Sequence, residues 1–309
     1  MTVSAAEQRI PYHRLARRHP STRWGTPLAV AAIAGGLYFI FSVIVLAIVQ
    51  SIAGATLSGD AYDEYFLQAT TNNVVLTHPL AIVLRLSSIA TMLPALLLAR
   101  LIMRSGGLGT LSSVAGRIRW RWFRIALIPA GAYLALQLLI GYVISPAISG
   151  ESLGEPTAAV GTFVAALVVI LLLVPVQATA EEYVFRGFVL QAVGTWWRWP
   201  ALAIALSVVP FVFGHAYNVW GLLEVLTFAL VAAWLSIRTG GLEAAIGVHI
   251  LSNVGAFGLP ALGFTGIEVA DGSPAGFLVA AVLLPAYAFA VVRLFTRLRL
   301  SPVASPVLA

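Results

Sequence analysis

The chain has 309 residues, of which 60% are hydrophobic and only 10% are charged. A soluble domain carries about 25% charged residues, so this composition excludes an ordinary soluble protein and indicates a polytopic membrane protein. The net charge of +6 rests on 18 basic residues, all of them arginine, and most lie just outside apolar stretches. This distribution is typical of membrane topology and argues against a nucleic-acid partner. The lack of cysteine excludes disulfides, thiolate metal ligands and a cysteine nucleophile.

Eight apolar stretches predict an all-α fold with about eight transmembrane helices. They cover residues 27–53, 79–102, 125–148, 158–195, 200–217, 220–237, 242–259 and 275–292. The first is longer than the roughly 7–15 apolar residues of a signal-peptide core, so we interpret it as a retained span. Strands are not expected, because a backbone in lipid satisfies its hydrogen bonds only within helices or a closed barrel.

The arginines predict the orientation of these spans. The segment before the first stretch and those after the second, fourth, sixth and eighth contain arginine. The loops after the first, third and seventh stretches contain acidic residues and no arginine. Because arginine-bearing loops stay on the cytoplasmic side, both termini are predicted to be cytoplasmic and the chain to be a multi-pass protein of the cell membrane.

The fourth stretch contains a charged cluster, Glu181, Glu182 and Arg186, which follows an uncharged apolar run from Ala158 to Ala180. Each charge at bilayer depth costs several kcal/mol, roughly 2.5–3.5 on insertion scales, unless it is paired or functional. Glu182 and Arg186 are four residues apart and share a helix face, which predicts an ion pair. Glu181 is rotated by about 100° and can point elsewhere. The alternative is that the cluster only marks the cytoplasmic end of a span.

Two more polar pairs occur inside apolar stretches with the same spacing of four: Phe211 with His215, and His249 with Asn253. A single intramembrane histidine or asparagine often serves only to hydrogen-bond neighbouring helices. With a rise of 1.5 Å per residue, however, Glu181 and His215 come out about 21–22 Å from the tryptophan-rich turn at residues 196–199. Asn253 comes out about 20 Å from the turn at residues 240–241, and His249 is nearer to it, at about 13 Å. Together the three motifs supply a carboxylate base, two imidazoles, an amide donor and a cation. These are the groups that amide hydrolysis needs.

The ordered set Glu-Glu-x-x-x-Arg, Phe-x-x-x-His and His-x-x-x-Asn resembles the family of CAAX prenyl proteases and bacteriocin-processing enzymes, which includes the Abi immunity proteins. The match covers about residues 160–260. The resemblance implies an eight-helix intramembrane endopeptidase that acts on a membrane-associated protein or peptide. The catalytic residues carried over from the family are Glu181, Glu182, Arg186, His215, His249 and Asn253.

The resemblance also implies a division of roles. Glu181 with His215 would activate the attacking water, His249 with Asn253 would stabilise the oxyanion, and the Glu182–Arg186 pair would orient the site. The family allows a metal-free mechanism and a zinc mechanism. Glu181, His215 and His249 would match the two-histidine, one-carboxylate ligand set of catalytic zinc. The chain lacks His-Glu-x-x-His, the usual zinc signature on a helix, so we favour a site without a cofactor, with zinc as the alternative.

These inferences divide the chain into four parts: a basic cytoplasmic tail (1–25), three N-terminal spans (26–155), a catalytic core (156–260), and a last span with a second basic tail (261–309). A non-enzymatic membrane protein that uses the same scaffold for immunity or binding remains the main alternative. A proton-coupled transporter is disfavoured, because the halves show no inverted repeat. Glu224 and Glu243 lie near span ends, where carboxylates are ordinary.

Overall fold

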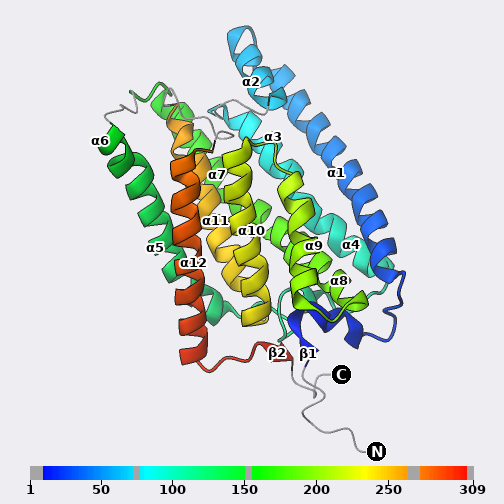
Figure 1. Cartoon of the computed structure of the whole chain (residues 1–309). Coiled ribbons are helices and arrows are strands. Elements are labelled where there is room, and N and C mark those ends of the chain that lie inside the picture. Colours follow the sequence, from blue (N-terminus) through cyan, green and yellow to red (C-terminus); the bar gives the residue numbers. More distant parts are fainter. Residues whose placement is uncertain (1–9, 72–76, 150–154, 264–271, 305–309) are drawn as a thin grey trace, which may run out of the picture.

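The computed structural model describes the chain except residues 1–9, 72–76, 150–154, 264–271 and 305–309. The described part is a bundle of long helices, as predicted for an all-α membrane protein (Figure 1). The α-helices are α1 Thr26–Thr56, α2 Asp60–Thr70, α3 Pro79–Ala90, α4 Met92–Ile102, α5 Trp120–Leu139, α6 Ser145–Ser149, α7 Val160–Glu182, α8 Leu190–Trp196, α9 Pro200–Phe213, α10 Val219–Thr239, α11 Glu243–Gly258 and α12 Pro274–Arg297. Shorter helical turns are η2 Tyr12–Arg18, η3 Leu108–Leu111, η4 Ile140–Ile144, η5 Tyr183–Val189 and η6 Pro260–Leu262.

Seven helical segments of the described chain are long and apolar enough to cross a membrane. The expected fifth span is shorter than predicted. Helix α9 has 14 residues, which gives about 21 Å, less than the ~30 Å hydrocarbon layer. The apolar sequence continues beyond Phe213, but the helix ends there and Gly214 follows as its C-cap. His215 therefore lies in a loop between α9 and α10.

The fourth span changes its helical geometry at the double glutamate. Helix α7 ends at Glu182 and continues as the π-helical turn η5 before α8 begins. Such π-bulges inside α-helices are rare and frequently occur at functional sites. In the bundle, α7 packs against α3 and α11, while α5 packs against α11 and α12. Helix α11 is the most buried of the long apolar helices, whereas α1 lies at the edge (Figure 1).

The first and last described segments of the chain meet at one end of the bundle (Figure 1). Residues Ile10–Pro11 (β1) pair antiparallel with Val303–Ala304 (β2), so the expectation of no strands fails for these short segments. They lie outside the apolar helices, where pairing between strands is not restricted by lipid. Residues 10–18 are also not a free tail, because Tyr12 is fully buried against the bundle. The paired segments at residues 10–11 and 303–304 therefore lie at the same end of the bundle.

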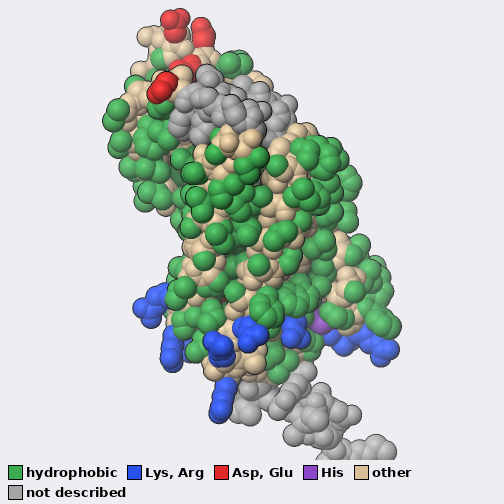
Figure 2. All heavy atoms as spheres, turned by 60° about the vertical axis from the view of Figure 1, so that its left-hand side comes forward, with side chains coloured by type: hydrophobic (Ala, Val, Ile, Leu, Met, Phe, Trp, Pro, Cys, Tyr) green, Lys and Arg blue, Asp and Glu red, His purple; other side chains and the backbone are tan. Residues whose placement is uncertain are grey.

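Charges separate along the bundle axis. Figure 2 shows arginines gathered around the lower end, where β1 and β2 lie in Figure 1, and acidic side chains at the opposite end. We predict that a reporter fused at residue 110 is cytoplasmic and that reporters at residues 60 and 270 are external. Alkaline phosphatase and fluorescent-protein fusions measure this directly. An external residue 110 with a cytoplasmic residue 60 would reverse the predicted orientation.

Candidate active site

Glu182 is the centre of a buried charge network. Its Oε1 accepts a hydrogen bond from Arg186 Nη1 at 2.9 Å, which confirms the predicted ion pair. The same oxygen accepts a second hydrogen bond from His249 Nδ1 at 2.7 Å. Glu182 and Arg186 are both 0% exposed, so each requires the other to offset the loss of hydration. These bonds connect α7 and η5 to α11.

His249 lies between the two glutamates. Its Nε2 is 3.3 Å from Glu181 Oε2, while its Nδ1 bonds to Glu182. A ring that carries a proton on both nitrogens donates to both carboxylates. In that state, the charges of His249 and Arg186 balance those of Glu181 and Glu182. Glu181 and Glu182, which are adjacent in the sequence, thus both contact His249 of α11.

Gln177 joins this network, although the sequence analysis did not single it out. Its Nε2 donates to Glu181 Oε2 at 2.6 Å, and its Oε1 accepts from Asn253 Nδ2 at 3.0 Å. The side chain is 3% exposed and is therefore held at both ends inside the protein. Its spacing of four from Glu181, within an otherwise apolar run, is the signal that could have identified it. Asn253 thus reaches Glu181 through Gln177.

One carboxylate oxygen of Glu181 takes no part in these contacts. Both Gln177 and His249 approach Oε2, and no hydrogen bond within the described residues involves Oε1. The residue is 7% exposed, so a small part of its surface remains accessible to a water molecule. A carboxylate fixed by one oxygen with the other accessible has the geometry of a general base.

Phe211, four residues before His215, packs against the guanidinium group of Arg186. The guanidinium carbon of Arg186 lies 4.0 Å from the centre of the Phe211 ring and 5.4 Å from that of Phe228. Phe228 also contacts His249, edge to face, with 4.7 Å between ring centres. These aromatic faces hold the cation where Glu182 meets it. Phe228, on α10, was not predicted from the sequence.

His215 is held by its own helix end. Its Nδ1 is 2.8 Å from the carbonyl oxygen of Phe211, and because a carbonyl only accepts, Nδ1 must carry the proton. In the neutral ring, Nε2 then has a free lone pair. No hydrogen bond joins His215 to Glu181 within the described residues, so the pairing expected from the resemblance is not formed directly.

The expected zinc ligands do not form a ligand set in this arrangement. Both ring nitrogens of His249 face carboxylate oxygens, Nε2 that of Glu181 and Nδ1 that of Glu182. Across the described residues, no group of three histidine, aspartate or glutamate side chains is placed to hold a metal ion. The residues as positioned therefore do not fit a catalytic zinc, and we derive no step through one.

Glu243 lies apart from this site and has a structural role. It is fully buried, and both its oxygens bond to the Arg119 guanidinium at 2.8 Å; Oε1 also accepts from the Arg119 backbone N–H. The pair fastens the start of α5 to the start of α11. Glu224, on α10, lies beside Gly276 at the beginning of α12. Its Oε1 is so close to this glycine that a Cβ atom placed on Gly276 would lie 2.6 Å from it.

Comparison with known proteins bears on the same region. Residues 162–255 match the family model described as type II CAAX prenyl endopeptidase Rce1-like. This segment contains all six predicted site residues together with Gln177 and Phe228. Residues 162–255 form an Rce1-like core. This stretch of the chain is therefore similar to the type II CAAX prenyl endopeptidases, and it lies within a multi-pass membrane protein.

A curated relative extends the comparison beyond the Rce1-like core. The chain is 36% identical over 150 residues to the uncharacterized protein YyaK of Bacillus subtilis (strain 168). The alignment covers 45% of this chain and 47% of YyaK, so the chain spans about half the length of this relative. No solved structure matches the chain.

Proposed function

We propose that this protein is an intramembrane endopeptidase that hydrolyses a peptide bond of a membrane-associated protein or peptide. The observation that carries the proposal is the placement of Glu181 in the Rce1-like core. Gln177 and His249 hold its Oε2, and its Oε1 remains without a partner among the described residues. Cleavage of a membrane-anchored, lipidated C-terminal peptide by the purified protein tests the proposal.

In the proposed reaction, Glu181 Oε1 takes a proton from water while the water oxygen bonds to the scissile carbonyl carbon. His215 Nε2, with its free lone pair, accepts the second hydrogen bond of that water. The tetrahedral intermediate places negative charge on the former carbonyl oxygen. The C–N bond then breaks as the proton on Glu181 passes to the leaving amine. No other reactant is required.

Asn253 supplies a donor for the oxyanion in this proposal. One N–H of its amide bonds to Gln177, and an amide nitrogen has a second N–H that remains for the substrate. Arg186 and His249 both bond to Glu182 Oε1, and His249 Nε2 also lies 3.3 Å from Glu181 Oε2, so the Glu182–Arg186 pair acts on Glu181 through His249. Glu182 and Arg186 are positioning residues, because both are fully buried.

The non-enzymatic alternative uses the same scaffold to bind a membrane-active peptide. It differs from the enzyme in one outcome, since such a protein binds the peptide and releases it intact. The ordered placement of a base, its supports and an amide donor favours the enzyme.

Metal dependence follows from the same geometry. We predict that chelator treatment leaves cleavage unchanged and that the purified protein contains no stoichiometric zinc, because His249 is engaged by both glutamates. Activity after dialysis against a chelator, together with elemental analysis, measures this. Loss of cleavage with chelator and its return with zinc would contradict the metal-free account.

A double-mutant cycle separates the two roles given to Asn253. Gln177→Leu releases Glu181 from its support and should lower turnover by about 10²-fold through misplacement of the base. Asn253→Ala removes an oxyanion donor and should cost about 10²–10³-fold. If Asn253 acts on the substrate itself, the losses multiply in the double variant. If it acts only through Gln177, the double variant loses no more than the worse single variant.

Gln137→Leu is the matched control, because Gln137 is an intramembrane glutamine of α5 outside the network. It should keep near-native turnover. An equal loss in Gln137→Leu and Gln177→Leu would mean that the effect comes from folding alone.

A further inference from the structure

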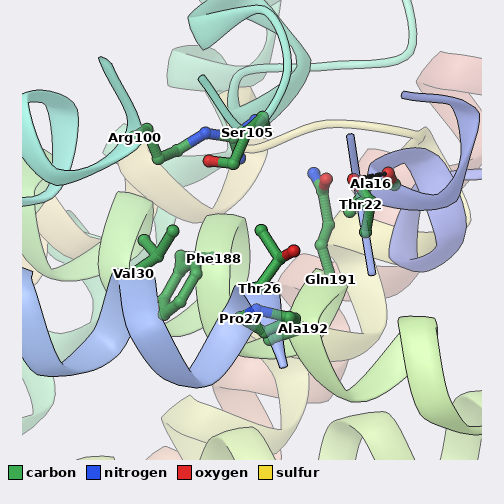
Figure 3. A pocket seen from close by; sticks show the side chains of 10 residues that line it. All are labelled: Ala16, Thr22, Thr26, Pro27, Val30, Arg100, Ser105, Phe188, Gln191 and Ala192. Atoms are coloured by element: carbon green, nitrogen blue, oxygen red, sulfur yellow. Dashed lines mark hydrogen bonds between the residues drawn. The ribbon is translucent and has the colours of Figure 1, made fainter. Parts of the chain in front are cut away.

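Two hollows in the described part of the chain differ in what they can hold. The one beside Arg100 encloses about 20 Å³, little more than the roughly 10–15 Å³ that one water molecule needs, so it has no room for a larger ligand (Figure 3). The other is a groove between α9, α10 and α12 with a volume of about 490 Å³. Small-molecule sites measure roughly 300–1,000 Å³, so the groove has the size of a ligand site.

The groove is apolar and lies on the outside of the bundle. All eight side chains that line it are apolar, among them Ile204 on α9, Trp234 on α10 and Phe289 on α12. Trp234 and Phe289 are 40% and 61% exposed, so the groove opens to the membrane rather than to the interior of the bundle. Such a lining suits a hydrocarbon chain, which it contacts on several sides, better than a polar ligand.

Two arginines lie at one end of this groove. Arg238 follows Trp234 by one helical turn, and its guanidinium carbon is 5.7 Å from the centre of that tryptophan ring. Arg293 follows Phe289 in the same way, with 5.2 Å between its guanidinium carbon and the ring centre. Helices α10 and α12 end side by side, because Gly240 after α10 lies against Pro302 after α12. Both cations therefore flank the groove at the arginine-rich end of the bundle.

The charge of these arginines indicates the chemistry of the ligand. Neither has a carboxylate partner within the described residues, where the ion pairs are those of Arg119, Arg186 and His249. Both side chains are exposed, and such long chains reach the headgroup level while their stems stay beside the apolar groove. The combination favours a ligand with an anionic group and a hydrocarbon chain. An anionic phospholipid has both, and basic pockets between transmembrane helices bind such headgroups.

We propose that the groove between α9, α10 and α12 binds one anionic phospholipid, with an acyl chain along Trp234 and Phe289 and the phosphate between Arg238 and Arg293. The two guanidinium groups donate charge-assisted hydrogen bonds to the phosphate oxygens. The acyl chain adds dispersion contacts to side chains of all three helices. The bound lipid would hold α10 and α12 together at the arginine-rich end. The site is separate from Glu181 and is tested without any hydrolysis.

Native mass spectrometry tests the two arginines, using full-length protein released from nanodiscs of phosphatidylcholine and phosphatidylglycerol with identical acyl chains. One phosphatidylglycerol should stay bound to the wild type after phosphatidylcholine is lost. Arg238→Gln/Arg293→Gln should retain it at least about tenfold less, because the charge-assisted hydrogen bonds are removed. Arg121→Gln/Arg124→Gln removes the same charge from exposed positions of α5, outside the groove, and should retain it like the wild type. Equal losses in both variants would show an effect of net charge and overturn the site.

Leu230→Trp tests the place of the acyl chain. Leu230 lines the groove and is 44% exposed, so a larger side chain there occupies the space without entering the core. This variant should also lose the bound phosphatidylglycerol. Leu278→Trp makes the same change at a 62% exposed position of α12 outside the groove and should keep it. Loss in the arginine variant but not in Leu230→Trp would overturn the placement of the chain in the groove.

Two further results would overturn the proposal. Equal retention of phosphatidylcholine and phosphatidylglycerol by the wild type would show that the site does not select an anionic headgroup. Displacement of phosphatidylglycerol by a lipidated peptide would assign the groove to the lipid chain of a substrate. All variants should keep the wild-type thermal midpoint in phosphatidylcholine alone, since the replaced side chains are exposed, and this separates lost binding from unfolding.

Discussion

Glu181→Gln is expected to abolish hydrolysis while the protein still folds. Glutamine keeps the shape of the side chain and can still bond to Gln177 and His249, but it cannot accept a proton from water. A general base contributes about 10²–10⁴-fold to rate, so single-turnover cleavage should fall by that factor. Cleavage rate and thermal midpoint, measured on the same preparation, separate chemistry from folding.

Glu224→Gln provides the control for this substitution. Glu224 is also an intramembrane glutamate, but it lies beside the start of α12 rather than in the Glu181 network. Its replacement should leave the cleavage rate near the wild-type value. Near-native cleavage by Glu181→Gln would instead remove the water-activating role and favour the binding protein.

Arg186→Met is expected to destabilise the fold as well as the chemistry. It removes one partner of a fully buried ion pair and leaves Glu182 with only His249. Breaking such a pair typically costs about 3–5 kcal/mol, because the remaining charge is buried without compensation. Yield and thermal unfolding in detergent should both fall well below those of Glu181→Gln.

The double variant Glu182→Gln/Arg186→Met tests this reason. Since it removes both charges, it should recover part of the stability that Arg186→Met loses. Its activity should stay low, because His249 then lacks its second carboxylate. A double variant less stable than Arg186→Met would mean that packing of Arg186 on Phe211 matters more than the ion pair.

The polar cluster could be predicted from the sequence because its members repeat one spacing in an apolar context. Glu182 and Arg186 are four apart, and only a helix face explains two charges at that distance in lipid. Gln177 was not predicted, because a single amide side chain in a span usually serves only to hydrogen-bond a neighbouring helix. Its place in the site depends on the hydrogen bond that it accepts from Asn253 of α11. The sequence of α7 alone does not predict that contact.

Details of the backbone were also not predicted from the sequence. The π-helical turn after Glu182 is not visible in hydrophobic periodicity, which continues through it. Helix α9 appeared to be a full span because apolar residues continue to Tyr217, although Gly214 ends it. Arg100 lies near the end of the second apolar stretch. It is buried because residues 10–25 fold back over it, a contact between distant parts of the chain.

The most direct test of the central claim is product analysis in ¹⁸O-labelled water. Wild-type protein and Glu181→Gln are each incubated in nanodiscs with a membrane-anchored peptide, and the products are examined by mass spectrometry. We predict that the wild type cuts at a defined bond and places one ¹⁸O in the new carboxylate, whereas Glu181→Gln leaves the peptide intact. Peptide that binds equally to both proteins and is recovered uncut from both would contradict the claim.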